Sequence, residues 1–338
     1  MRQNWLIMTH DLTTARPASN RIRAIDVARG LALVAMAIYH FTWDLEFFGY
    51  VEPGLTAFGG WKIFARCIAS SFLFLVGVSL VLAHARGVRW RPFLIRLAQV
   101  ALAAAAISLV TWLAVPGGFI FFGILHQIAL ASLLGVLLLR VPALVLAALA
   151  ALVIAAPFFL RSEVLDTPWL WWVGLSSVNP HSNDYVPLFP WFGAVLLGMA
   201  AAKLAQRFGI FERMRSWSPP RPLRVLEAGG RHSLAFYLIH QPVLISLVWI
   251  AAQLAPPPAP DPRVGFSRAC QAQCIEVRDQ AFCSSYCGCV MEGVAELPGG
   301  IAGLDRNSGD GSQQTRLQEI AAMCTGETDL QQLDSPDE

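Results

Sequence analysis

Residues 141–160 read VPALVLAALAALVIAAPFFL and contain no ionisable side chain. An α-helix of about 20 apolar residues spans the roughly 30 Å hydrocarbon core of a bilayer. The whole chain suits this environment, because 55% of its 338 residues are hydrophobic and only 14% are charged. Soluble domains carry about 25% charged residues. A purely water-soluble protein is therefore excluded, and the net charge of +2 gives no support to nucleic-acid binding.

Six further apolar stretches of similar length lie on either side of this one. Together they predict an all-α fold: a polytopic membrane helix bundle of about seven transmembrane helices with a small cysteine-rich helical C-terminal tail. The run Pro256–Pro260 ends the membrane part, because proline stretches stay extended and cannot continue a helix. The predicted spans are 25–48, 64–84, 93–114, 119–139, 141–160, 188–206 and 233–254.

Arginine and lysine determine the predicted orientation of the bundle. They collect in the N-terminal segment through Arg29, in the loop after the second span, at Arg140 and in the segment 203–231. The opposite connections contain only Lys62 and Arg161. Because basic residues favour the cytoplasmic side, we predict a multi-pass protein of the inner (cytoplasmic) membrane with a cytoplasmic N-terminus. Seven spans then place the C-terminus in the periplasm or outside the cell.

The chain is thus expected to have three parts. These are a cytoplasmic N-terminal segment (1–20), a transmembrane domain (21–255) and a cysteine-rich extracytoplasmic tail (256–338). Outside the cytoplasm, the six tail cysteines would meet an oxidising compartment, where disulfides persist.

The spacing of the tail cysteines predicts two short helices that disulfides join as a hairpin. Cys270 and Cys274 are one helical turn apart, and so are Cys283 and Cys287. Six cysteines allow 15 pairings, and the sequence does not choose among them. Zinc is the weaker alternative, because the tail has no histidine and no Cys-x2-Cys spacing. The acidic last dozen residues, 327–338, are expected to be disordered.

The first span carries the most ionisable side chains, which are costly inside a membrane and therefore mark functional candidates. At about 100° per residue, Asp26, Arg29, His40 and Asp44 lie on one narrow face of this helix. His40 and Asp44 are four residues apart, so the carboxylate can orient the imidazole and stabilise its charged form. The alternative is a structural network that fixes how the helix packs.

Other spans offer partners for this face. Arg66 lies near the outer end of the second span, and His126 lies in the fourth. Tyr237 and His240 share a face of the seventh span. Pro242 frees a backbone carbonyl in the same helix, which suits a polar cavity better than lipid.

Buried histidines with neighbouring carboxylates suit general-base chemistry better than metal binding, and no metal is expected. A base at His40 would deprotonate a hydroxyl or amine during acyl transfer. Arg29 would hold an anionic group such as a phosphate. The same side chains would serve equally well to carry protons in a transporter. No phosphate-binding loop, dinucleotide fingerprint, HExxH or GxSxG motif is present.

The first-span motif R-x-x-x-I-D-x-x-R-G-x-A-x-x-x-M-x-x-x-H, residues 21–40, resembles the first helix of a known group of membrane enzymes. It is similar to the catalytic-domain family of heparan-alpha-glucosaminide N-acetyltransferase and its bacterial relatives, which belong with the acyltransferase-3-like enzymes. The resemblance covers roughly residues 21–254 and does not include the tail. Further similar stretches, in the expected order, are 72–80, 121–130, 185–200 and 230–245.

The resemblance implies an integral membrane acyltransferase that uses cytoplasmic acetyl-CoA, an acyl-CoA, as its acyl donor. The acetyl group would pass to a sugar amine or hydroxyl on the far side of the lipid bilayer. The chain has fewer spans than the eukaryotic enzyme and no large luminal domain, so a bacterial envelope glycan or small sugar is the expected acceptor. The alternatives are a proton-coupled transporter or flippase and a non-catalytic scaffold.

The resemblance also assigns roles to individual residues. The family's essential histidine corresponds to His40, which would act as the base or the transient acyl carrier, oriented by Asp44. The family's aspartate and arginine correspond to Asp26 and Arg29, expected to bind the acetyl-CoA. The residues expected to line the cavity are Arg66, His126, Tyr237 and His240.

Overall fold

The structure, a computed structural model, describes residues 21–257, 261–275, 277–297, 300–301 and 311–334. Within these ranges the regular elements are helices, and the only strand-like feature is an isolated bridge between Ser162 and Ser176. The all-α prediction is confirmed. The predicted cytoplasmic segment 1–20 lies outside the described residues.

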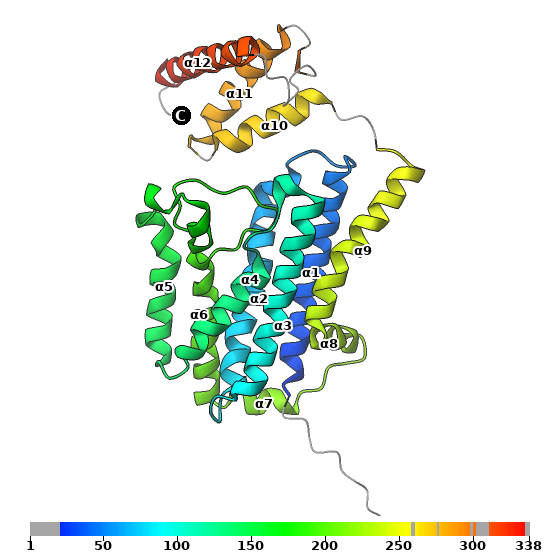
Figure 1. The fold of residues 1–338 in the computed structure, drawn as a ribbon, viewed down its shortest axis with the longest axis vertical. Helices are drawn as coiled ribbons and strands as arrows, with labels where there is room; N and C mark the ends of the chain where they lie inside the picture. The colour runs from blue at the N-terminus through cyan, green and yellow to red at the C-terminus, as the bar shows by residue number, and fades with distance from the viewer. Residues whose placement is uncertain (1–20, 258–260, 276, 298–299, 302–310, 335–338) are drawn as a thin grey trace, which may run out of the picture.

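Seven helices occupy the predicted spans and stand side by side (Figure 1). In the described residues, five of them are long and apolar enough to cross a membrane. The other two, α4 and α5, have 14 and 17 residues, about 21 and 26 Å at 1.5 Å per residue. The count of seven spans therefore stays a prediction. The seven are α1 (Arg23–Phe47), α2 (Gly59–Ala83), α3 (Trp90–Ala114), α4 (Ile124–Leu137), α5 (Ala143–Phe159), α6 (Leu188–Arg207) and α9 (Ser233–Leu254).

The bundle packs around α1, α2 and α6. Helix α2 contacts α1, α4 and α6, whereas α5 packs on α6 and α9 packs on α1. The core contains fully buried side chains such as Leu73 and Met199. Many outward-facing residues are large and apolar, among them Leu144 and Phe158, each more than 80% exposed. Such a surface requires lipid rather than water around it.

Two short helices at the predicted cytoplasmic end were not anticipated from the sequence: α7 (Ile210–Ser216) and α8 (Leu223–Arg231). Helix α8 packs tightly on α1 because glycines face the partner backbone at the crossing. A Cβ atom on Gly30 would collide with the backbone of Leu226, and one on Gly230 with the backbone of Asp26. The crossing therefore fixes the position of α8 against the first turns of α1.

Gly230→Ala is expected to destabilise the protein by about 1–3 kcal/mol, because the added methyl group overpacks the crossing of α1 and α8. The measurement is thermal unfolding of the purified protein in detergent. Gly229→Ala is the matched control, since a Cβ at Gly229 meets nothing within 4 Å. Alanine there favours the helix by up to about 1 kcal/mol. Equal unfolding temperatures for the two variants would contradict the close crossing.

The tail forms three helices: α10 (Pro262–Cys274), α11 (Gln280–Ala295) and α12 (Gly311–Asp334). Disulfides join Cys270 to Cys287 and Cys274 to Cys283, so α10 and α11 form the predicted hairpin. A third disulfide, Cys289–Cys324, ties α12 to α11. The disulfide prediction is confirmed, and no metal-binding cluster occurs in the described part of the chain.

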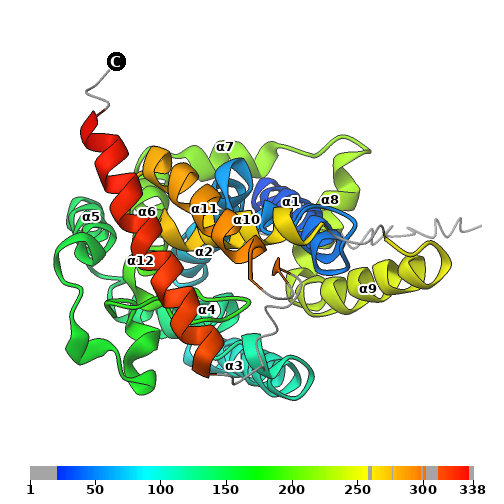
Figure 2. The same ribbon diagram turned by 90° about the horizontal axis from the view of Figure 1, so that it is seen from above.

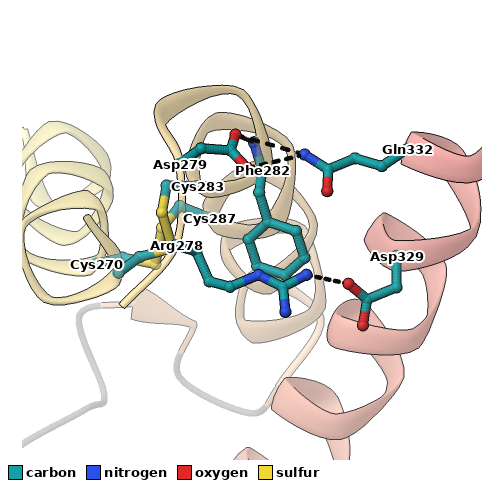
Figure 3. Close-up of a disulfide and its surroundings, with 9 residues drawn as sticks. Cys270, Arg278, Asp279, Phe282, Cys283, Cys287, Asp329 and Gln332 are labelled. Carbon is teal, nitrogen blue, oxygen red and sulfur yellow. Dashed lines mark hydrogen bonds and ion pairs between the residues drawn. A yellow bond between two sulfur atoms is a disulfide. The ribbon is translucent and has the colours of Figure 1, made fainter. Parts of the chain in front are cut away.

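Part of the acidic C-terminal segment was expected to be disordered, and this prediction was wrong for residues 327–334, which lie in α12. The third disulfide and the burial of Thr328 hold this helix against α11. Figure 3 shows two polar contacts that connect α12 to the start of α11. Arg278 pairs with Asp329, and Gln332 donates to Asp279 at 3.3 and 3.4 Å.

The tail lies across one end of the bundle (Figures 1 and 2) and touches the loop between α1 and α2. Arg268 of α10 pairs with Glu52 and donates to the Pro53 carbonyl at 3.4 Å. The loop itself is held by Glu46 of α1, whose carboxylate accepts from the Gly54 N–H at 2.6 Å and the Thr56 N–H at 2.9 Å. The tail therefore rests on an ordered part of the bundle.

Candidate functional site

A cavity of about 1010 Å³ opens at the end of the bundle opposite the tail, between α2, α3 and the junction of α8 with α9. Its inner wall is apolar and reaches Leu125 and Tyr237, which pack together. Among the described residues, no acidic side chain lines it. The arginines that line it are Arg21, Arg29, Arg89, Arg96 and Arg231.

Asp26 holds two of these arginines in place. Its carboxylate accepts from Arg21 at 2.5 and 3.0 Å and from Arg29 at 2.8 Å. Arg29 also donates to the Ser79 hydroxyl at 2.5 Å. Asp26 is only 1% exposed and does not line the cavity itself, and its expected part in binding acetyl-CoA stays a prediction.

The arginine cluster carries more positive charge than its own carboxylate neutralises. Arg29 lies close enough to Arg21 and Arg96 for their charges to repel it. No ion pair joins Arg96 to an acid within the described ranges. An anionic ligand with several negative charges would relieve this repulsion, and guanidinium groups bind phosphates with good geometry.

His40 and His240 lie beyond the inner end of the cavity, with ring centroids 5.0 Å apart. His240 also contacts Tyr237, at 5.6 Å between ring centroids, so the cavity wall leads directly to the histidine pair. The Nδ1 atom of His240 lies 2.7 Å from the Tyr237 carbonyl, which assigns the proton to Nδ1. Its buried Nε2 atom has no partner. Among the described residues, the ring of His40 makes no hydrogen bond.

Asp44 is fully buried one turn further along α1. It accepts a hydrogen bond of 2.7 Å from Gln241 of α9 and makes none with His40. The second carboxylate oxygen of Asp44 and the side-chain oxygen of Gln241 have no partner. The structure therefore places Asp44 beside the histidine pair, while its orienting effect on His40 stays a prediction.

His126 is engaged elsewhere. Its Nδ1 atom accepts from the Gly123 N–H at 3.2 Å, which caps the start of α4, and its Nε2 atom lies 3.2 Å from the Ser108 hydroxyl. These contacts give His126 a role in ordering the turn before α4. It is not brought together with His40.

Asp184 connects the loop before α6 to the inner end of the cavity. It accepts a hydrogen bond of 2.9 Å from the Ile124 N–H and another from the Tyr237 hydroxyl. Burial raises the pKa of the Asp184 carboxyl above its usual range, and these two hydrogen bonds act in the opposite direction. Sequence reasoning missed this role, because one acid in an irregular loop belongs to no periodic pattern.

Arg66 does not belong to this site. It lines a second cavity on another side of α2, together with residues of α5 and α6. The predicted residues thus form three groups. Asp26 and Arg29 lie near the mouth of the arginine-rich cavity. Its inner end has Tyr237, His40, His240 and Asp44, whereas Arg66 and His126 lie apart from both groups.

The comparison with protein families gives a match that covers the transmembrane bundle from α1 into α9. The family model described as heparan-alpha-glucosaminide N-acetyltransferase, catalytic, matches residues 21–242, more than half of the chain. The chain belongs to this family. The matched residues of this family member include the arginine cluster and the histidine pair but not the tail. Family membership and the membrane-spanning helices together make it a membrane acetyltransferase. No curated protein and no solved structure matches the chain.

Proposed function

We propose that the protein takes an acetyl group from acetyl-CoA at the arginine-rich cavity and passes it to a sugar amine or hydroxyl on the side of the tail. The arginine-rich side is the cytoplasmic one in this proposal, and the membrane is the inner membrane. The observation that carries it is the continuous path from the arginine cluster through Tyr237 to His240 and His40.

The donor suits the cavity in charge and in length. Coenzyme A has phosphates at one end and a thioester at the end of a long flexible arm. Arg29 and His40 are 11 residues apart on α1, about 16 Å along the axis. Phosphates held by the arginines would allow the arm to follow the apolar wall, with the thioester near Tyr237 and the histidines.

The transfer needs one group that accepts a proton or carries the acetyl group, and His40 is the proposed residue. In the direct route, His40 takes the proton of the acceptor while the acceptor attacks the thioester carbonyl. The carbon–sulfur bond then breaks and the sulfur leaves as the thiol after receiving that proton. In the two-step route, His40 attacks first and holds the acetyl group until the acceptor removes it. The net products are the same: an acetylated acceptor and free coenzyme A.

The acceptor would find unsatisfied hydrogen-bond acceptors at the histidine pair. The Nε2 atom of His240, one oxygen of Asp44 and the side-chain oxygen of Gln241 are buried without partners. Buried polar atoms without partners are costly, and N–H or O–H groups of a ligand would satisfy them. A sugar offers several such donors. This supports an amino sugar or polyhydroxyl acceptor, such as an envelope glycan or small sugar.

A transfer assay tests the proposal. The purified protein is reconstituted in proteoliposomes. Acetyl-CoA with a labelled acetyl group is added on one side of the membrane and glucosamine on the other. We expect labelled N-acetylglucosamine in the glucosamine compartment and release of coenzyme A in equal amount. A brief incubation without glucosamine separates the routes, because label retained on the protein indicates the two-step route. Proton-coupled glucosamine movement without acetylation would overturn the proposal in favour of transport.

A further inference from the structure

A second cavity, of about 1570 Å³, lies between α1, α2, α5, α6 and the loop that precedes α6. Its rim faces outward from the bundle, because Leu31 is 54% exposed and Phe158 is 81% exposed. In a membrane these side chains meet lipid, so the cavity is open to the bilayer from the side. The proposed function makes no use of this space.

A packed wall separates this cavity from the donor cavity. Leu75 of α2 lines both of them. Leu33, Met36 and Ile68 are buried together, with Phe72 against them, between α1 and α2. The two cavities are therefore distinct sites on opposite sides of this wall, and a ligand in one does not enter the other.

Two arginines without carboxylate partners line the second cavity. Arg66 lies seven residues after the start of α2, about 10 Å along the helix axis. Arg161 lies two residues after Phe159, the last residue of α5. Both are exposed, and neither makes an ion pair within the described part of the chain. Charged side chains at the edge of a membrane are favoured by an anionic partner, and an anion between the two arginines would supply one.

The other polar lining supports an anionic headgroup. Ser70 follows Arg66 by one helical turn, and Asn179 comes from the loop before α6. Hydroxyl and amide groups donate hydrogen bonds to phosphate oxygens and to headgroup hydroxyls. Within the part of the chain that the structure describes, no acidic side chain lines this cavity. One end is thus positive and polar, and the remainder is apolar and open to the bilayer.

We infer that this cavity binds an anionic phospholipid from the leaflet next to the α1–α2 loop. Its phosphate would lie at Arg66 and Arg161, and its acyl chains would run along Leu31, Phe74 and Phe158. A soluble phosphate would leave the apolar part without a partner. Basic pockets between membrane helices bind lipid headgroups by this combination of charge and apolar surface.

The experiment uses the full-length protein in detergent micelles with phosphatidylglycerol or phosphatidylcholine added, and measures bound lipid by native mass spectrometry. The wild-type protein should retain phosphatidylglycerol in preference to phosphatidylcholine. The affinity of the double variant Arg66→Gln/Arg161→Gln for phosphatidylglycerol should fall at least about tenfold, because two charged hydrogen-bond donors to the phosphate are lost. Lys62→Gln is the matched control: it removes the same charge from α2, one turn from Arg66 and outside the cavity.

Three outcomes decide the matter. Loss of phosphatidylglycerol in the double variant but not in Lys62→Gln supports the site. Equal retention of phosphatidylglycerol by wild type, the double variant and Lys62→Gln would mean that only annular lipid is bound, and would overturn the proposed site. Competition by glycerol 3-phosphate at the same concentration as the lipid would also overturn it, in favour of a soluble phosphate site. Thermal unfolding checks that the double variant is folded, and acetyl-CoA binding should be unchanged because the donor cavity lies beyond the wall.

Discussion

Replacing His40 with alanine is expected to lower acetyl transfer by about 10²–10⁴-fold, the usual contribution of a positioned general acid or base. His40 is the residue on α1 that faces the second histidine at the inner end of the donor cavity, with ring centroids 5.0 Å apart. Its ring nitrogen atoms make no hydrogen bond within the described ranges, so they are available for the proposed reaction. Without a base at this position, no side chain accepts the proton that the acceptor amine or hydroxyl loses during the transfer.

The measurement compares kcat for labelled acetyl transfer with equilibrium binding of acetyl-CoA. His40→Ala should lose turnover but bind acetyl-CoA normally, because the arginine cluster is intact. His181→Ala is the matched control, since His181 lies exposed in the loop before α6. Undiminished transfer by His40→Ala would assign the chemistry to another residue. Unfolding temperatures of both variants show whether the loss of acetyl transfer comes from a loss of folded protein.

The second large effect is expected at the mouth of the donor cavity. The double variant Arg96→Gln/Arg231→Gln should raise the KM for acetyl-CoA by roughly 10- to 100-fold with kcat nearly unchanged. Both arginines line the cavity without an acidic partner among the described residues, so their loss removes ligand contacts rather than internal ion pairs. Arg29 is unsuitable for this test, because its removal also disturbs the buried Asp26.

Arg91→Gln is the control for this variant. Arg91 lies on α3, five residues before Arg96, and is exposed but does not line the cavity. Its substitution should leave the KM unchanged. Raising the salt concentration should reproduce part of the KM increase in wild type, since salt screens exposed charges. Equal KM values for the double variant and Arg91→Gln would place the phosphates elsewhere.

The helices of the bundle were predictable from the sequence because hydropathy and length decide membrane insertion. The helical face with Asp26, Arg29, His40 and Asp44 was also predictable, since these residues repeat at helical spacing. Neighbours within one helix do not, however, reveal partners on another helix. Asp44 and His40 share a face of α1, yet the hydrogen bond of Asp44 goes to Gln241 across the helix interface.

Other features depend on contacts that no local pattern encodes. Helix α8 has a short, charged sequence, and its close packing depends on Gly230 meeting the backbone of α1. Asp184 reaches Tyr237 only because the loop before α6 folds inward. The three disulfides depend on how α10, α11 and α12 pack against one another. The cysteine spacing limits the possible pairings but does not determine them.

The disulfide-linked tail has a consequence for how the protein is made. All six of its cysteines follow α9, so they emerge from the translocation machinery after the whole bundle has been synthesised. With the proposed orientation, Cys289 and Cys324 can pair only after α12 has reached the oxidising side of the membrane. A chain inserted upside down would keep these thiols reduced in the cytoplasm, without the crosslink that holds α12. In the proposed orientation, the redox state of the tail would thus distinguish correctly inserted molecules from inverted ones.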